Sequence, residues 1–120
     1  MDTRLVGHWG EQTAGEYLKK KRYKPVAMNF SCRMGEIDLI AKNREYIVFV
    51  EVKLRKNADF AEAKEFVTRS KQEKIIKTAS LWLSKNPIDL QPRFDVIEIY
   101  APDGPKTKNI TINHIENAFE

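Results

Sequence analysis

Apolar side chains recur every three or four residues in two stretches of the chain, and this spacing predicts two helices. The first spans residues 4–21, and its stripe expected to face the interior consists of Gly7, Gly10, Ala14, Tyr17 and Leu18. The second spans residues 68–85 and ends at Asn86-Pro87, because a proline disfavours helical backbone at the residue before it.

Shorter apolar runs predict strands at residues 26–31, 93–100 and 109–115, and two more within residues 35–56. A short helical tail is expected after the last strand. The resulting order, α-β-β-β-α-β-β, predicts an α/β fold in which a mixed central sheet is flanked by helices. With 120 residues, the chain is expected to form one domain, residues 1–120, in which the indistinct segment 57–67 is a mobile loop.

The distribution of charge points to a polyanionic partner. The formal net charge is +4, and basic residues cluster at positions 19–24 and again at positions 69–77. Such clusters can line a phosphate backbone and bind it through counterion release, although cations are also favoured at the C-terminal ends of helices. Charge alone therefore leaves two interpretations open, a nucleic-acid surface and solvated helix ends.

The chain lacks the sequence features of membrane and secreted proteins. No apolar run approaches the ~20 residues that a membrane helix needs. The first twenty residues carry charges where the apolar part of a signal peptide would lie. Cys32 is the single cysteine, so it can form neither an intramolecular disulfide nor a cysteine metal site. These features predict a cytoplasmic protein of bacterial type.

Charged side chains interrupt the two apolar strands of residues 35–56. Because side chains alternate between the faces of a strand, the second strand has one wholly apolar face, and Glu51 and Lys53 share the opposite, mixed face. A connecting loop of even length around Asn43 would place Asp38 on the mixed face too, with its Cβ ~5 Å from the residue opposite it. Asp38, Glu51 and Lys53 are therefore expected to form one cluster.

Two carboxylates so close together repel each other, and burying them is unfavourable unless a cation joins them. Lys53 supplies one positive charge, and a hard divalent cation, which prefers oxygen ligands, would supply more. Glu11 borders the inward stripe of the first helix, where small residues would let it approach the same cluster. The alternative is an edge hairpin with solvated charges, a common protection against aggregation.

Three further polar residues carry weaker signals. His8 and His114 are isolated and show no metal-ligand spacing, so we expect an exposed helix residue and a residue at a strand end. The pattern does not decide whether Asp95 supports the sheet or the charged cluster.

Five blocks occur in a specific order along the chain: GHWGEQTAGEYL, GEIDLIA, FVEVKLR, SKQEKIIKTASLWL and RFDVIEIY. In this order they resemble the PD-(D/E)XK nuclease superfamily, and more closely its YraN-like family of small bacterial predicted endonucleases. The core of that family is similar to that of archaeal-type Holliday junction resolvases. The resemblance covers nearly the whole chain and implies a restriction-endonuclease-like core. Ile37 stands where the superfamily name has proline, a departure that is common in this branch.

The resemblance implies a metal-dependent nuclease that hydrolyses phosphodiester bonds in DNA, with branched or otherwise structured DNA as a candidate substrate. Asp38 and Glu51 are the implied ligands of Mg²⁺ or Mn²⁺, together with the carbonyl group of Val52. Glu11 would complete the metal site directly or through water. Lys53 would position or activate the attacking water.

The block at residues 70–74 implies contacts with DNA phosphates through Lys71, Gln72 and Lys74. Two other functions stay open, a non-catalytic nucleic-acid-binding module that retains the fold and a subunit of a larger repair or DNA-processing complex. The enzyme is favoured because a clustered acidic site without a metal would repel nucleic acid. A homodimer is a candidate assembly, since cutting two strands symmetrically needs two copies of the site.

Overall fold

The computed structural model describes residues 3–56 and 67–119. Its elements are α1 (Thr3–Lys20), β1 (Lys24–Cys32), β2 (Gly35–Lys42), β3 (Tyr46–Arg55), α2 (Arg69–Lys85), β4 (Gln91–Tyr100), the 3₁₀ helix η3 (Gly104–Lys106) and β5 (Thr111–Phe119). The five strands form one sheet in the order β1-β2-β3-β4-β5, with β3 and β4 parallel and the other neighbours antiparallel. The predicted order and restriction-endonuclease-like architecture are confirmed. The loop predicted at residues 57–67 lies outside the described residues, apart from Val67.

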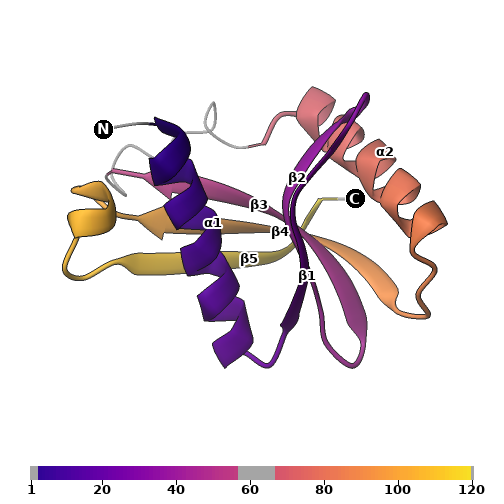
Figure 1. The fold of residues 1–120 in the computed structure, drawn as a ribbon, viewed down its shortest axis with the longest axis horizontal. Coiled ribbons are helices and arrows are strands. Elements are labelled where there is room, and N and C mark those ends of the chain that lie inside the picture. Colours follow the sequence, from indigo (N-terminus) through magenta and orange to yellow (C-terminus); the bar gives the residue numbers. More distant parts are fainter. Residues whose placement is uncertain (1–2, 57–66, 120) are drawn as a thin grey trace.

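Helices α1 and α2 cover opposite faces of the sheet (Figure 1). Alternate residues of β3 divide between the two cores, as the period of a strand requires. Val48 and Val50 pack in the core under α1, whereas Ile47 and Phe49 pack in the core under α2. Burial of each such side chain stabilises the fold by ~1.5–3 kcal/mol, so the two cores hold both helices against the sheet.

Local hydrogen bonds fix the ends of both helices. After α1, Arg22 adopts a left-handed backbone with φ of 71°, and the N–H of Tyr23 donates to the Leu18 carbonyl at 2.9 Å. This closure satisfies a carbonyl at the end of the helix. At the start of α2, the Thr68 hydroxyl accepts the N–H of Lys71 at 3.2 Å, which is an N-cap.

The helical tail predicted after the last strand is wrong, because β5 continues to Phe119. The Phe119 ring stacks on Phe94 of β4 with centroids 5.3 Å apart, and a helix of a few residues could not compensate for losing this contact. Ile37 also differs from the strict alternation, since it packs under α2 while Leu39, on the same strand, packs under α1. The side-chain alternation of β2 therefore breaks between Ile37 and Leu39.

Within the residues that the structure describes, no helix is long and apolar enough to cross a membrane.

Candidate functional site

Strands β2 and β3 separate halfway along their length, and the predicted cluster lies at this fork. Their pairing runs from Lys42 opposite Ile47 to Leu39 opposite Val50 and then stops. Beyond that point β2 continues beside β1, while β3 continues beside β4 (Figure 1). The register pairs even with odd positions, so the predicted even-length connection is confirmed.

Asp38 lies at the fork and bonds to the backbone across it. Its Oδ2 accepts the N–H of Val52 at 2.8 Å, in place of a backbone carbonyl of β2. This bond satisfies a donor that the end of the β2–β3 ladder leaves without a strand partner. It holds the Asp38 side chain beside β3, within reach of the carboxyl groups of Glu11 and Glu51.

Glu51 is the buried carboxylate of the cluster. Its side chain is 7% exposed, and Oε1 lies 3.2 Å from the Nζ of Lys71 on α2. Burial raises the pKa of Glu51 to about 7, the negative charge of Asp38 adds to the rise, and Lys71 opposes it. Because the negative charges of Asp38 and Glu51 repel each other, a positive charge between them would be favourable.

Lys53 follows on the same side of β3. Burial lowers the pKa of Lys53, and the positive charge of Lys71 lowers it further. Lys53 and Gln72 line a pocket of about 210 Å³ between the sheet and the start of α2. The three side chains Glu51, Lys53 and Lys71 therefore influence one another, as the sequence predicts for the first two.

Glu11 approaches Asp38 from α1. Burial raises the pKa of Glu11, and the charge of Asp38 raises it further, which places the two carboxyl groups near each other. The close approach of α1 depends on Gly10, where a Cβ atom would lie 3.1 Å from the Cδ2 of Leu54 on β3. Gly7, predicted to play the same role, has open space around it.

The predicted phosphate contacts lie on the first two turns of α2. Lys71 pairs with Glu51, and the Nε2 of Gln72 donates to the Val67 carbonyl at 3.0 Å. Lys74 is exposed beside Gly35, where β2 begins. Lys71 and Gln72 therefore border the carboxylate cluster, whereas Lys74 lies toward the β1–β2 hairpin.

The donor set is compatible with a magnesium-type cation in one respect and incomplete in another. The two carboxylates at the fork, Asp38 and Glu51, are the hard oxygen ligands that such a cation takes. Mg²⁺ commonly binds one or two carboxylates and keeps several waters. As the side chains stand, no three His, Cys, Asp or Glu residues of the described segments form a group that could hold a metal ion. Asp38 and Glu51 would therefore be the direct ligands, and Glu11 would act through water or after a rotation of its side chain.

Comparison with known families shows which family the chain belongs to. The model of the Uncharacterised protein family UPF0102 matches residues 10–99. The chain belongs to this family. The resemblance to the YraN-like family is confirmed in this form, whereas the nuclease superfamily stays a prediction.

Relatives in UPF0102 match along almost the full chain. The protein from Caldanaerobacter subterraneus is 46% identical over 120 residues, covering 99% of this chain and 98% of its own length. The protein from Geobacter sulfurreducens is 42% identical and covers 98% of this chain and 90% of its own length. The protein from Vibrio vulnificus is 45% identical and covers 97% of this chain and 93% of its own length.

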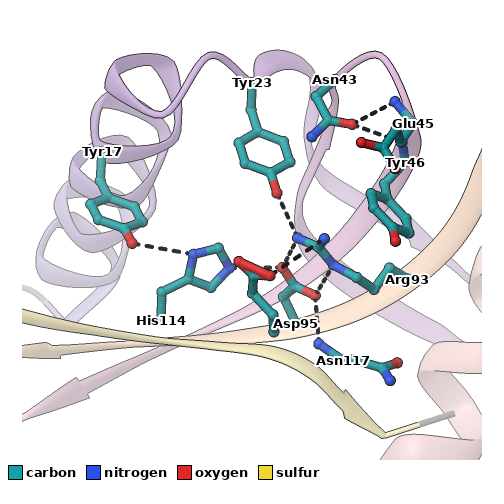
Figure 2. Close-up of polar contacts among 10 residues, drawn as sticks. Tyr17, Tyr23, Asn43, Glu45, Tyr46, Arg93, Asp95, His114 and Asn117 are labelled. Carbon is teal, nitrogen blue, oxygen red and sulfur yellow. Dashed lines mark hydrogen bonds and ion pairs between the residues drawn. The ribbon is translucent and has the colours of Figure 1, made fainter.

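A second polar network lies under α1 in this UPF0102 chain, on the opposite face of the sheet from the pair of Glu51 and Lys71, and it answers the open question about Asp95 (Figure 2). Asp95 is fully buried and accepts hydrogen bonds from Arg93 at 2.9 and 2.8 Å. His114 Nε2 lies 2.7 Å from Asp95 Oδ2, and Nδ1 lies 3.2 Å from the Tyr17 hydroxyl on α1. Burial alone would raise the pKa of Asp95, but the bonds from His114 and Arg93 outweigh it and lower the pKa. Asp95 therefore supports the packing of α1 on the sheet.

The role of His114 in this network was not predicted from the sequence. Its side chain is 6% exposed and lies inside β5, so the predicted residue at a strand end is wrong. His8 is exposed, as predicted. One signal was available, because Arg93 and Asp95 alternate in step with Ile97 on a face that is otherwise core.

The raised pKa of Glu51 predicts how the stability of the metal-free protein depends on pH. Since the pKa is higher in the folded protein than in an unfolded chain, stability falls as the pH rises from about 4.5 to about 7. Asp38→Asn removes one cause of the rise and keeps an acceptor for the Val52 N–H. We expect the variant to exceed wild type in unfolding free energy by about 1 kcal/mol at pH 8, with little difference at pH 4.5. Urea unfolding in EDTA measures both values. An equal difference between Asp38→Asn and wild type at the two pH values would contradict the raised pKa of Glu51.

Proposed function

We propose that this UPF0102 protein is a metal-dependent nuclease of the PD-(D/E)XK type, which hydrolyses phosphodiester bonds in DNA. The observation that carries the proposal is the fork between β2 and β3, where buried Glu51 and Asp38 lie together with Lys53 and Lys71 close by. A cluster of this kind stabilises a divalent cation and presents a lysine beside it. Branched or otherwise structured DNA is the candidate substrate.

Each side chain has a distinct part in the proposed reaction. Asp38 and Glu51 would hold Mg²⁺ or Mn²⁺, with the carbonyl of Val52 as a further ligand, and Glu11 would support the site. The bound cation would lower the pKa of a water and neutralise charge on the phosphoryl oxygens. Lys53 donates a hydrogen bond to the attacking water and holds it in position.

The position of α2 supports DNA as the substrate. Its first turns carry the basic cluster of residues 69–77 at the edge of the fork, where Lys71 and Lys74 line a hollow of about 280 Å³. The second cluster, residues 19–24, lies at the C-terminal end of α1. The α2 cluster is the one that borders the fork, since Lys24 pairs with Lys42 at the other end of β2. A positive surface beside an acidic site would bring a phosphate backbone to it.

A binding module without catalysis is the second candidate, and the electrostatics of the fork count against it. Carboxylates at a phosphate-binding surface weaken binding unless a cation neutralises them. Action within a larger repair or DNA-processing complex, a homodimeric state and a cytoplasmic location are compatible with the nuclease and belong to the proposal.

A cleavage screen tests the function directly. Labelled single-stranded, duplex, flap and four-way DNA are incubated with the protein and Mg²⁺, Mn²⁺ or EDTA. We expect cleavage of at least one structured substrate with metal and none in EDTA or with Asp38→Asn. Tight DNA binding by the wild type without cleavage of any substrate would favour the binding module.

Replacing Lys71 and Lys74 together with glutamine is expected to weaken DNA binding and reduce its salt dependence. Each lost phosphate contact lowers the slope of log affinity against log salt by roughly one unit. Fluorescence anisotropy over a range of salt concentrations measures the slope. The matched control replaces Lys106 and Lys108, two exposed lysines beyond β4, and should leave the slope unchanged.

A further inference from the structure

The ion pair between Lys71 and Glu51 is unequal in its exposure. The Glu51 side chain is 7% exposed, whereas that of Lys71 is 43% exposed, although their charged atoms are only 3.2 Å apart. The carboxylate is fixed on a central strand. The ammonium group is at the end of a flexible side chain whose other end is anchored on α2, so only Lys71 can leave the pair without disturbing the sheet.

The groups around Glu51 determine which positive partner it pairs with. Glu51 needs a positive partner, because a carboxylate that is only 7% exposed is costly to bury without one. Asp38, which accepts the N–H of Val52, the residue after Glu51, brings a second carboxylate to the same place. A single ammonium group therefore serves a site with two carboxylates. A divalent cation shared by Asp38 and Glu51 would neutralise this charge more fully.

We propose that Lys71 is an exchangeable counterion of Glu51, which competes with the divalent cation for this carboxylate and is released when the cation binds. The proposal rests on the proposed nuclease function, because it assumes a cation site at Asp38 and Glu51. Metal binding then frees the ammonium group of Lys71 at the mouth of the fork. The phosphate contact of Lys71 becomes available only when the metal needed for cleavage is in place.

Direct measurement of Mn²⁺ binding tests the competition without reference to activity. Free Mn²⁺ is followed by electron paramagnetic resonance while it is titrated into the full chain without DNA. Lys71→Gln removes the competing charge, so its affinity for Mn²⁺ is expected to rise by ~3- to 10-fold, the scale of a half-exposed ion pair. Lys71→Arg keeps the charge and should bind Mn²⁺ within about twofold of wild type on the same scale.

Lys85→Gln is the matched control, since it makes the same change in net charge at the exposed far end of α2. Its Mn²⁺ affinity should equal that of wild type. Unchanged or weaker Mn²⁺ binding by Lys71→Gln, or equal tightening by Lys71→Gln and Lys85→Gln, would overturn the exchange. Circular dichroism at the titration temperature checks that each variant is folded, and Lys71→Met, which also removes the charge, serves if the glutamine variant is not.

The same titration separates this inference from the function on which it rests. If wild type binds no Mn²⁺ in a manner that depends on Asp38, the proposed metal site itself is wrong. If wild type binds Mn²⁺ through Asp38 and the Lys71 variants bind it no more tightly, the site stands and only the exchange is wrong.

Discussion

Lys53→Ala is expected to slow metal-dependent DNA cleavage by ~10²-fold or more, the scale seen when one donor to a transition state is lost. The variant keeps Asp38 and Glu51 and the basic start of α2, so DNA affinity should change little. Single-turnover cleavage with excess protein measures the chemical step apart from binding. Lys56→Ala, which changes an exposed lysine just beyond β3, is the matched control and should cleave at the wild-type rate.

The two readouts distinguish catalysis from binding. A fall in cleavage that is matched by an equal fall in DNA affinity would mean that Lys53 binds phosphate and does not act on the attacking water. The partial burial that lowers the pKa of Lys53 agrees with a positioned donor close to the reacting groups.

Asp95→Asn is expected to lower the unfolding free energy by about 3 kcal/mol, as found when one partner of a buried ion pair is removed. The Arg93 guanidinium, whose side chain is 9% exposed, would lose its buried counter-charge. It would keep the exposed Glu116 at 3.6 Å and the aromatic rings of Tyr23 and Tyr46. Urea unfolding at pH 7 measures the loss. Asp89→Asn, at an exposed position before β4, is the control and should be near wild type.

A loss below about 0.5 kcal/mol would show that the network around Asp95 contributes no more than an ordinary surface contact. In that case the packing of α1 would depend on its apolar face alone, through residues such as Ala14 and Leu18.

The charged cluster was predictable because it depends on local periodicity. The alternation of side chains along β3 places Glu51 and Lys53 on one face, and the even length of the connection brings β2 alongside in the predicted register. The small residue Gly10 on the first helix predicts its close approach to the sheet. These features need no knowledge of distant parts of the chain. The position of Asp38 itself also depends on the break in β2 and on its bond to the Val52 N–H, which the order of residues does not predict.

Other features depend on tertiary contacts that periodicity does not contain. His114 reaches Asp95 because β5 pairs with β4 in one register, and Tyr17 completes the contact from α1, 97 residues away in the chain. The pairing of Lys71 with Glu51 likewise depends on where α2 crosses the sheet. The tail after Ile115 has helical composition, but the stacking of Phe119 on Phe94 keeps it extended.

Anomalous diffraction from crystals soaked in Mn²⁺ tests most directly whether the fork between β2 and β3 holds a divalent cation. We expect a strong anomalous peak about 2 Å from carboxylate oxygens of both Asp38 and Glu51, with the Nζ of Lys71 moved away from Glu51. No anomalous peak at the fork, with Lys71 still paired to Glu51, would contradict it.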